Sequence, residues 1–179
     1  MRKYIILFAV CMIIISGCSI VGPMIPSESP PSTESDSQLL QKAESLRGAF
    51  FYRGECDEQC QKVIEAYKEA VELSKDPEVR AQAQQKLAEF LFWLKDFDEA
   101  LVYARQLAAS RDAKYRCQGY HLMGNIMRQM KRYNDALGYF YNALETCESK
   151  DNAERSICYT YADLGRKEDA DDFCTPYYS

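Results

Sequence analysis

The sequence predicts an all-α fold of stacked antiparallel helical hairpins, about four in number. Over residues 38–174 there is a single proline, Pro77, and no run in which apolar and polar residues alternate strictly, as they do in a half-buried strand. Apolar residues instead recur three and four positions apart, as at Leu87, Leu91 and Leu94. The segment also repeats itself at intervals of 36 and 34 residues, which predicts a solenoid of similar units.

Residues 1–17 have the pattern of a secretory signal peptide. Two basic residues are followed by an apolar run over residues 4–15, which is too short for a permanent membrane span. The small residues Ser16 and Gly17 then precede Cys18. This junction resembles the bacterial lipobox, whose cysteine is acylated, for example with palmitate, and becomes the first residue of the mature protein. A plain signal peptide with an incidental cysteine is the alternative.

The lipobox resemblance implies a lipoprotein whose folded part lies in the cell envelope. Several acyl chains, at about 0.8 kcal/mol per buried methylene, would hold Cys18 on a membrane durably. Ser19 rather than Asp follows the cysteine. By the enterobacterial sorting pattern this implies the outer membrane rather than the inner one, with the domain periplasmic or surface-facing. Residues 18–37 combine four prolines with many serines, which predicts that a disordered tether follows the acylated cysteine.

Ala100, Ala136 and Ala170 mark three copies of the internal repeat, in the strings F-D-E-A-L, Y-N-D-A-L and K-E-D-A-D. A helical segment and a short polar turn precede each copy. The best-formed copy resembles the tetratricopeptide repeat (TPR), in which small residues, here Gly124, Ala136 and Ala143, let two antiparallel helices approach closely.

The TPR resemblance implies a TPR-like helical repeat domain, an α-solenoid, over residues 38–179. An isolated hairpin cannot bury its apolar face, so successive copies must stack. The first copy is irregular, because Gly54 stands where its first helix should carry a large residue. A helical bundle with accidental spacing is the alternative.

Six cysteines remain beyond the signal peptide and the anchor, and an even number in an exported chain indicates disulfides. Six cysteines allow fifteen connectivities. The hairpin arrangement favours bonds within one hairpin, because antiparallel helices bring their opposite ends together. A four-residue spacing inside a continuous helix would, however, place the first pair poorly. The predicted pairs are Cys56 with Cys60, Cys117 with Cys147, and Cys158 with Cys174.

No metal site, cofactor or catalytic site is expected. A zinc or haem site favours clustered cysteines, or cysteine with histidine, and the only short cysteine pair here is C-D-E-Q-C. Cys117 and His121 are four residues apart on one helical face and could pair as nucleophile and base, but a disulfide-bonded thiol cannot attack. The sequence also lacks the G-x-S-x-G, H-E-x-x-H, phosphate-loop and dinucleotide motifs, so an enzyme is not expected.

In the TPR family the first helix of each repeat lines an inner groove. Transfer by offset implies a peptide-binding groove of amide, charged and aromatic side chains in this chain. Such side chains suit an extended peptide, whose backbone can exchange hydrogen bonds with Gln and Asn. The alternative is a solvated helical face without a ligand. The groove residues expected in this way are Gln82, Gln85, Glu89, Phe92, Gln118, His121, Asn125, Arg128, Asn152, Arg155 and Tyr159.

The charge and the segments together predict a function in protein binding. A formal net charge of -5 argues against a nucleic-acid partner, because phosphate backbones bind basic surfaces. Anchor, tether and groove predict a membrane-anchored scaffold of the bacterial cell envelope, which binds a protein or extended peptide and assists assembly of a secretion, pilus or other envelope complex. An adaptor or regulator of cell-wall enzymes is the alternative, since the same features would serve it.

Overall fold

The computed structural model describes residues 35–50 and 56–177. The chain divides into two units, Met1–Thr33 and Glu34–Ser179, and all the described residues lie in the second. The expected signal peptide, Cys18 and the tether as far as Glu34 therefore lie outside the described residues, as does Gly54.

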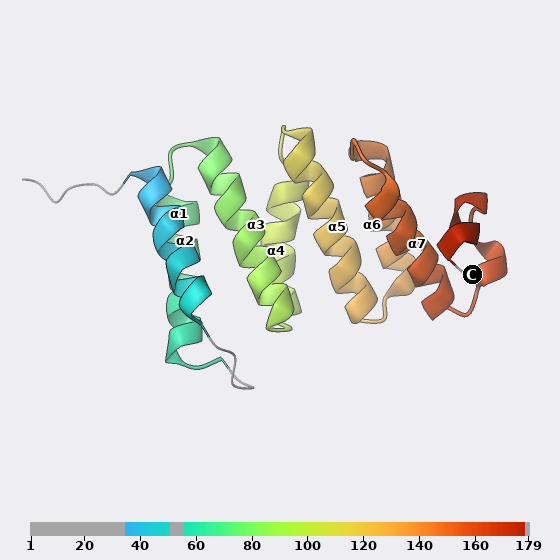
Figure 1. The fold of residues 1–179 in the computed structure, drawn as a ribbon, viewed down its shortest axis with the longest axis horizontal. Helices are drawn as coiled ribbons and strands as arrows, with labels where there is room; N and C mark the ends of the chain where they lie inside the picture. The colour runs from blue at the N-terminus through green and yellow to red at the C-terminus, as the bar shows by residue number, and fades with distance from the viewer. Residues whose placement is uncertain (1–34, 51–55, 178–179) are drawn as a thin grey trace, which may run out of the picture. The chain divides into compact units, whose positions relative to one another are not determined.

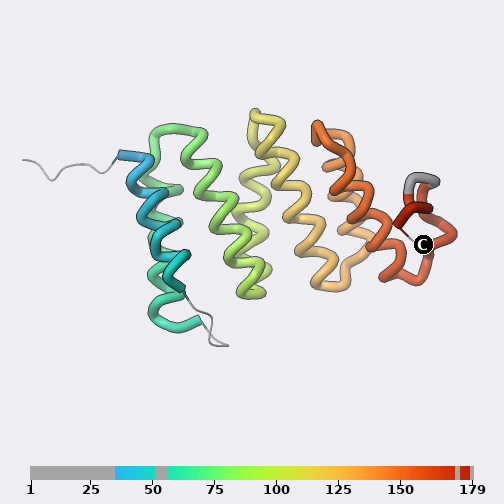
Figure 2. Tube along the Cα trace, viewed as in Figure 1, coloured from blue at the N-terminus to red at the C-terminus, as the bar shows by residue number. Residues whose placement is uncertain are grey.

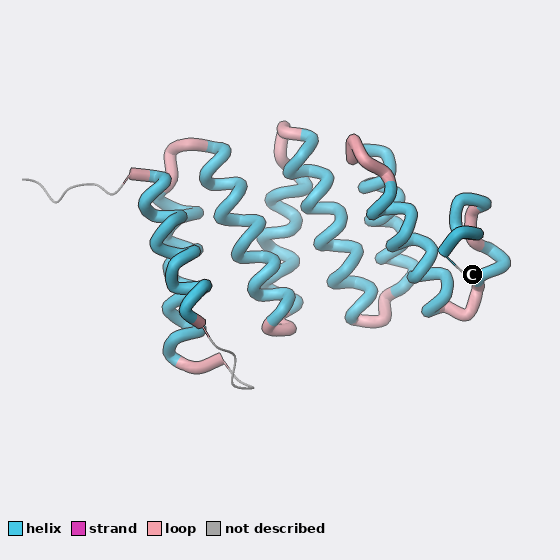
Figure 3. Tube along the Cα trace, viewed as in Figure 1, coloured by secondary structure: helices cyan, strands magenta, loops and turns pink. Residues whose placement is uncertain are grey.

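The described residues form an all-α repeat fold, as predicted. Figure 1 shows the helices of this unit side by side in chain order, and Figure 2 follows the chain as it reverses direction between them. Figure 3 shows helices and connecting loops in the described part, without a strand. None of the described helices is long and apolar enough to cross a membrane. The α-helices are α1 (Asp36–Ala49), α2 (Glu58–Leu73), α3 (Pro77–Trp93), α4 (Phe97–Ala108), α5 (Ala113–Gln129), α6 (Tyr133–Thr146) and α7 (Asp151–Asp163).

The first helix begins at Asp36, two residues before the predicted start at Gln38. Ser35 and Gln38 form a capping box, in which the Gln38 amide N–H donates to Ser35 Oγ at 3.4 Å and the Ser35 N–H donates to Gln38 Oε1 at 2.8 Å. Asp36 then accepts hydrogen bonds from the backbone N–H groups of Lys75 and Asp76, at 2.8 and 2.6 Å. These bonds tie the start of α1 to the loop before α3.

The same turn follows the helices α3, α5 and α7. Lys95, Lys131 and Gly165 follow α3, α5 and α7, and all three have left-handed backbone conformations, with φ of 65°, 60° and 69°. After α3, the Lys95 N–H donates to the Phe92 carbonyl at 3.0 Å and the Asp96 N–H to the Leu91 carbonyl at 2.9 Å. Equivalent pairs of bonds follow α5 and α7, so each helix ends in a Schellman motif. The repeat seen in the sequence is therefore also a repeat of backbone geometry.

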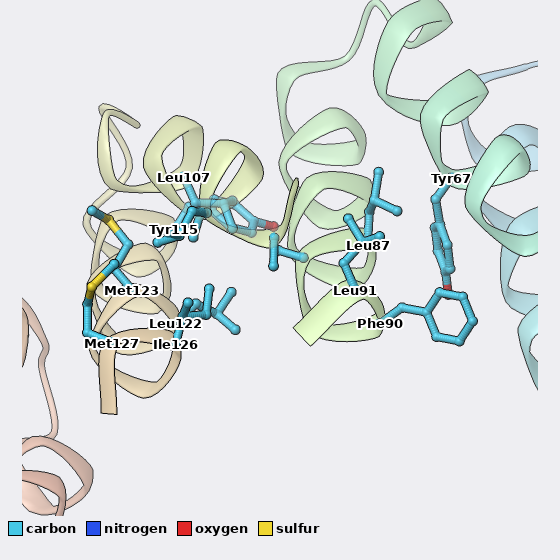
Figure 4. Close-up of a cluster of buried hydrophobic side chains, with 14 of the residues drawn as sticks. Tyr67, Leu87, Phe90, Leu91, Leu107, Tyr115, Leu122, Met123, Ile126 and Met127 are labelled. Carbon is cyan, nitrogen blue, oxygen red and sulfur yellow. The ribbon is translucent and has the colours of Figure 1, made fainter. Parts of the chain in front are cut away.

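Small residues allow the helices to pack closely within and between hairpins. Ala100 and Ala136, which mark the repeat, are fully buried. A Cβ added to Gly124 would approach the Phe140 ring to 2.5 Å, so α5 and α6 meet at a glycine. A Cβ added to Gly119 would lie 2.8 Å from the Ala104 carbonyl oxygen, and α5 thus also meets α4 of the preceding hairpin at a glycine. Figure 4 shows part of the apolar cluster that results, with side chains from α2 to α5.

The fourth hairpin differs from the prediction. Instead of a second α-helix around Ala170, the chain forms two 3₁₀ segments, Lys167–Asp169 and Asp172–Tyr177, and Ala170 between them is extended and half-buried. The segment is rich in acidic residues, has few apolar residues to form a buried stripe, and contains Pro176, which disfavours a helix before it. The described domain thus has three complete helical hairpins, and α7 packs against shorter segments.

The cysteines are paired as the hairpin arrangement predicts. The Cα atoms of Cys56 and Cys60 are 5.1 Å apart, those of Cys117 and Cys147 5.0 Å, and those of Cys158 and Cys174 5.2 Å. The obstacle foreseen for the first pair does not arise, because α2 begins after its N-cap residue Asp57, which lies between the two cysteines. In the last pair, Cys158 lies on α7, whereas Cys174 lies on a 3₁₀ segment rather than on a facing α-helix.

The close packing of α5 against α4 predicts opposite effects for two glycine substitutions. Gly119→Ala should lower the free energy of unfolding by about 1–3 kcal/mol, because the new methyl group meets the backbone of α4. Gly138→Ala, on an exposed position of α6 with nothing within 4 Å, should raise it by about 0.5–1 kcal/mol through helix propensity. Urea unfolding of both variants measures the difference, and effects of the same sign would contradict the packing described.

The disulfides should differ in their contribution to stability according to the chain length that each closes. Replacing Cys117 and Cys147 by serine, 30 residues apart, should lower the free energy of unfolding by roughly 3–4 kcal/mol on the loop-entropy scale. The same change at Cys56 and Cys60, four residues apart, should cost only about 2 kcal/mol. Urea unfolding without reductant provides the comparison, and an equal or reversed order would show that loop closure does not govern their effect.

Candidate functional site

Most of the predicted groove residues line one pocket on the first helices of three successive hairpins. Nine of the eleven lie there, together with Leu122 and Ser156, around a volume of about 530 Å³. We call this the inner pocket. Its lining from α3 is Gln85, Glu89 and Phe92, from α5 Gln118, His121, Leu122 and Asn125, and from α7 Asn152, Arg155, Ser156 and Tyr159.

The two remaining groove residues make contacts beside the pocket. Gln82 donates through Nε2 to Glu78 Oε1 at 3.0 Å, one turn earlier on α3. Arg128 pairs through Nε with Asp163 Oδ2 at 2.6 Å, and its guanidinium lies over the Tyr159 ring, 5.7 Å from the centroid. Arg128 thus helps to position an aromatic ring of the inner pocket and is not itself part of the lining.

The transfer by offset missed Leu122 and Ser156. Each directly follows a predicted groove residue on its helix, so a wider stripe of helix surface would have included both. Leu122 is buried and contributes an apolar surface. The Ser156 hydroxyl donates to the Asn152 backbone carbonyl at 2.7 Å and is therefore already engaged within its own helix.

The lining charges balance one another. Glu89 supplies one negative charge and Arg155 one positive charge, and His121 is the only further titratable group apart from Tyr159. Gln85 donates through Nε2 to Glu89 Oε1 at 2.8 Å, and Lys86 Nζ lies 3.9 Å from the same carboxylate. Burial lowers the pKa of His121 below its usual value, which favours the uncharged imidazole at neutral pH. The pocket is therefore polar without a strong net charge.

Gln118 contributes a buried acceptor without a partner. Its Oε1 atom is shielded from solvent and has no hydrogen bond in the structure. Leaving a buried polar atom without a bond costs about 1–3 kcal/mol. Gln118 lines the inner pocket as a residue, while its Oε1 atom lies below the accessible surface.

Two aromatic residues beside the α3–α4 turn, Trp93 and Phe97, do not line the inner pocket. Trp93 is 46% exposed and stacks against Phe90 at the end of α3, with the Arg47 guanidinium 5.4 Å from its ring. Phe97 is half-buried at the start of α4 and lies 5.9 Å from Phe92, measured between ring centroids. Phe97 thus packs against Phe92, which lines the inner pocket.

Cys117 and His121, the candidate nucleophile and base, lie close together, but the Cys117 sulfur is part of a disulfide bond. Cys117, Cys147 and His121 lie so that the two sulfur atoms and one imidazole nitrogen are all within 4.8 Å of one another. A second pocket of about 480 Å³ borders all three and shares Gln118, His121 and Asn152 with the inner pocket. With Cys117 bonded to Cys147, its sulfur is not a free nucleophile.

Comparison with known proteins identifies one repeat. The tetratricopeptide repeat family matches residues 118–150, which comprise most of α5, all of α6 and the loop before α7. Among solved structures, a MamA mutant is 14% identical with a TM-score of 0.49, and the match covers 80% of this chain and 91% of that one. A MamA MSR-1 structure is also 14% identical with a TM-score of 0.49, covering 77% of this chain and 89% of its own. No curated protein matches the chain.

Proposed function

We propose that this protein is a binding scaffold that holds an extended segment of a partner protein in the inner pocket. The carrying observation is that side chains from α3, α5 and α7 line a single pocket. The tetratricopeptide repeat matched over residues 118–150 includes most of α5, one of the three helices that line the pocket.

The lining suits a peptide backbone in an extended conformation. Such a backbone keeps its N–H and C=O groups unpaired, and a Gln or Asn side chain offers both a donor and an acceptor to it. Gln85, Asn125 and Asn152 supply these amides from three different helices, so hydrogen bonds would be spread along the peptide.

Aromatic rings lie on the two outer helices of the pocket. Phe92 belongs to α3 and Tyr159 to α7, on either side of the α5 residues. Tyr159 is 43% exposed although Arg128 contacts its ring, so apolar surface remains available to a ligand. Exposed aromatic side chains lose little conformational entropy on binding and often dominate binding energies. We therefore assign peptide side-chain contacts to these two rings.

Substitution of two pocket residues should weaken peptide binding. The ligand is a peptide selected from a random library for binding to the full chain. Asn125→Ala combined with Arg155→Ala in the protein should raise the Kd for this peptide at least about fivefold, which corresponds to about 1 kcal/mol. Asn142→Ala with Arg105→Ala is the matched control, because it removes the same residue types from exposed positions on α6 and α4. Isothermal titration calorimetry measures both Kd values.

The control pair should leave Kd unchanged. Equal weakening by both pairs, or selected peptides that bind independently of the pocket pair, would contradict binding in the inner pocket. Thermal unfolding of each variant separates loss of binding from loss of fold.

We further propose that the scaffold acts at the bacterial cell envelope, attached by a lipid on Cys18. The support is the lipobox-like junction ending at Cys18, followed by the proline- and serine-rich stretch over residues 18–37. An anchored domain on a tether would sample the space near the membrane, where it could hold a component of a secretion, pilus or similar complex during assembly. Ser19 after the cysteine favours the outer membrane under the sorting pattern described above.

The lipid anchor predicts a defined mature N-terminus. Mass spectrometry of the protein from bacterial membranes should find the chain starting at an acylated Cys18, and Cys18→Ala should leave the membrane fraction. A Cys11→Ala variant controls for removal of a cysteine from the apolar run and should remain anchored. Membrane retention of the Cys18→Ala protein, or an unmodified N-terminus at another residue, would show that the anchor is wrong.

A further inference from the structure

The structure groups two cysteines with the only histidine of the chain. Cys117 and His121 are one helical turn apart on α5, and Cys147 is the C-cap residue directly after α6. Their two sulfur atoms and one imidazole nitrogen lie within 4.8 Å of one another. No metal site is expected from the sequence, because its only short cysteine pair is C-D-E-Q-C, whereas the α5–α6 hairpin brings Cys147 beside Cys117 and His121.

We propose that Cys117, Cys147 and His121 form a redox-controlled zinc site, closed as a disulfide when oxidised and able to bind one Zn²⁺ when reduced. Two thiolates and one imidazole are ligands that zinc prefers, and three protein ligands with a fourth open position are common in zinc sites that admit water or a small ligand. This inference does not depend on the proposed peptide binding.

The geometry favours this group over the other cysteine pairs. Residues at i and i+4 of a helix lie on the same face, so Cys117 and His121 point to one side of α5. The other two pairs, Cys56 with Cys60 and Cys158 with Cys174, have no histidine available, because the chain contains only His121. Only the α5–α6 pair can therefore provide a mixed sulfur and nitrogen ligand set.

The neighbouring pocket gives access to the group and room for a fourth ligand. A pocket of about 480 Å³ is bordered by all three residues and by Gln118 and Glu148. Cys117 is half-buried beside it, so a small dithiol can reach the bond, while Cys147 is only 7% exposed. A water molecule in this pocket could serve as the fourth zinc ligand, and Gln118 is among the polar residues that line it.

The charges around the pocket allow a cation. Lys114 also borders it, but its ammonium group is paired with Glu78 at 3.4 Å and lies over the Tyr115 ring. Glu148 adds a negative charge to the lining. Deprotonation of the two thiols on metal binding would add two further negative charges, which a divalent cation neutralises.

The two states interconvert by thiol–disulfide exchange with a dithiol reductant. The dithiol supplies two electrons and two protons, the bond between Cys117 and Cys147 breaks, each sulfur becomes a thiol, and the reductant becomes a disulfide. Zinc then binds the two thiolates, and two protons are released to solvent. Oxidation reverses the sequence and expels the zinc.

The test is zinc binding by the full chain before and after reduction. Under anaerobic conditions, protein treated with excess dithiol and then freed of it should bind one more Zn²⁺ than a Cys117→Ser/Cys147→Ser variant, measured by competition with a chromogenic chelator. The oxidised protein should show no such difference. His121→Ala, which retains all cysteines, should weaken zinc binding at this site by more than the roughly 10–100-fold that loss of an outer-shell partner costs.

Cobalt substitution and a second cysteine variant distinguish this site from the other thiols. Reduced protein with Co²⁺ should show the absorption of a tetrahedral thiolate site, and His121→Ala should change that spectrum. Cys158→Ser/Cys174→Ser is the matched control and should retain the extra zinc ion. Equal zinc binding by wild type and the Cys117→Ser/Cys147→Ser variant, an unchanged affinity in His121→Ala, or loss of the zinc ion in the control would each overturn the proposal.

Discussion

The fold depends on the inability of any single hairpin in this chain to bury its own apolar residues. The seams within and between hairpins are filled from both sides, and α5 shows this most directly. Gly119 and Gly124 let it approach α4 and α6 more closely than a side chain would permit. Between neighbouring hairpins, the buried Tyr115 of α5 donates a hydrogen bond to Glu78 at the start of α3, at 2.5 Å. Each hairpin is therefore stabilised largely by its neighbours, as in other repeat folds.

The hairpin turn makes this stacking regular. A left-handed residue after α3, α5 and α7 ends each helix in the same way, and two of the three positions are lysines, which tolerate that conformation less well than glycine. This conformational strain is offset because the turn places the following segment antiparallel to the helix, where its apolar residues can pack. At the last copy the turn is made by Gly165, but the following residues cannot form a buried helical stripe. The α7 hairpin is closed instead by 3₁₀ segments and by the bond between Cys158 and Cys174.

Stacking also creates the candidate site. Once the apolar residues of α3, α5 and α7 occupy the seams, their remaining polar residues fall on one shared surface, and nine predicted groove residues meet there around one pocket. The neighbouring group of Cys117, Cys147 and His121 arises for the same reason, because the α5–α6 hairpin places the end of one helix beside the start of the other. The inner pocket and the pocket beside the sulfur–nitrogen cluster thus share Gln118, His121 and Asn152 as lining residues.

The sequence alone determined the helical class, the repeat and the cysteine pairing, because periodic burial and hairpin connectivity are local properties of the chain. The positions of the groove residues were implied by the resemblance to the tetratricopeptide repeat, transferred by offset along the chain. Only the tertiary structure decided that Arg128 turns to Asp163 and that Ala170 lies outside a helix, because both depend on neighbours remote in sequence and on whether a segment can bury enough apolar surface. It also decided that the Gln118 Oε1 atom is buried without a partner and that Cys117, His121 and Cys147 border one pocket, since burial of single atoms and the shape of a surface depend on the packing of several helices.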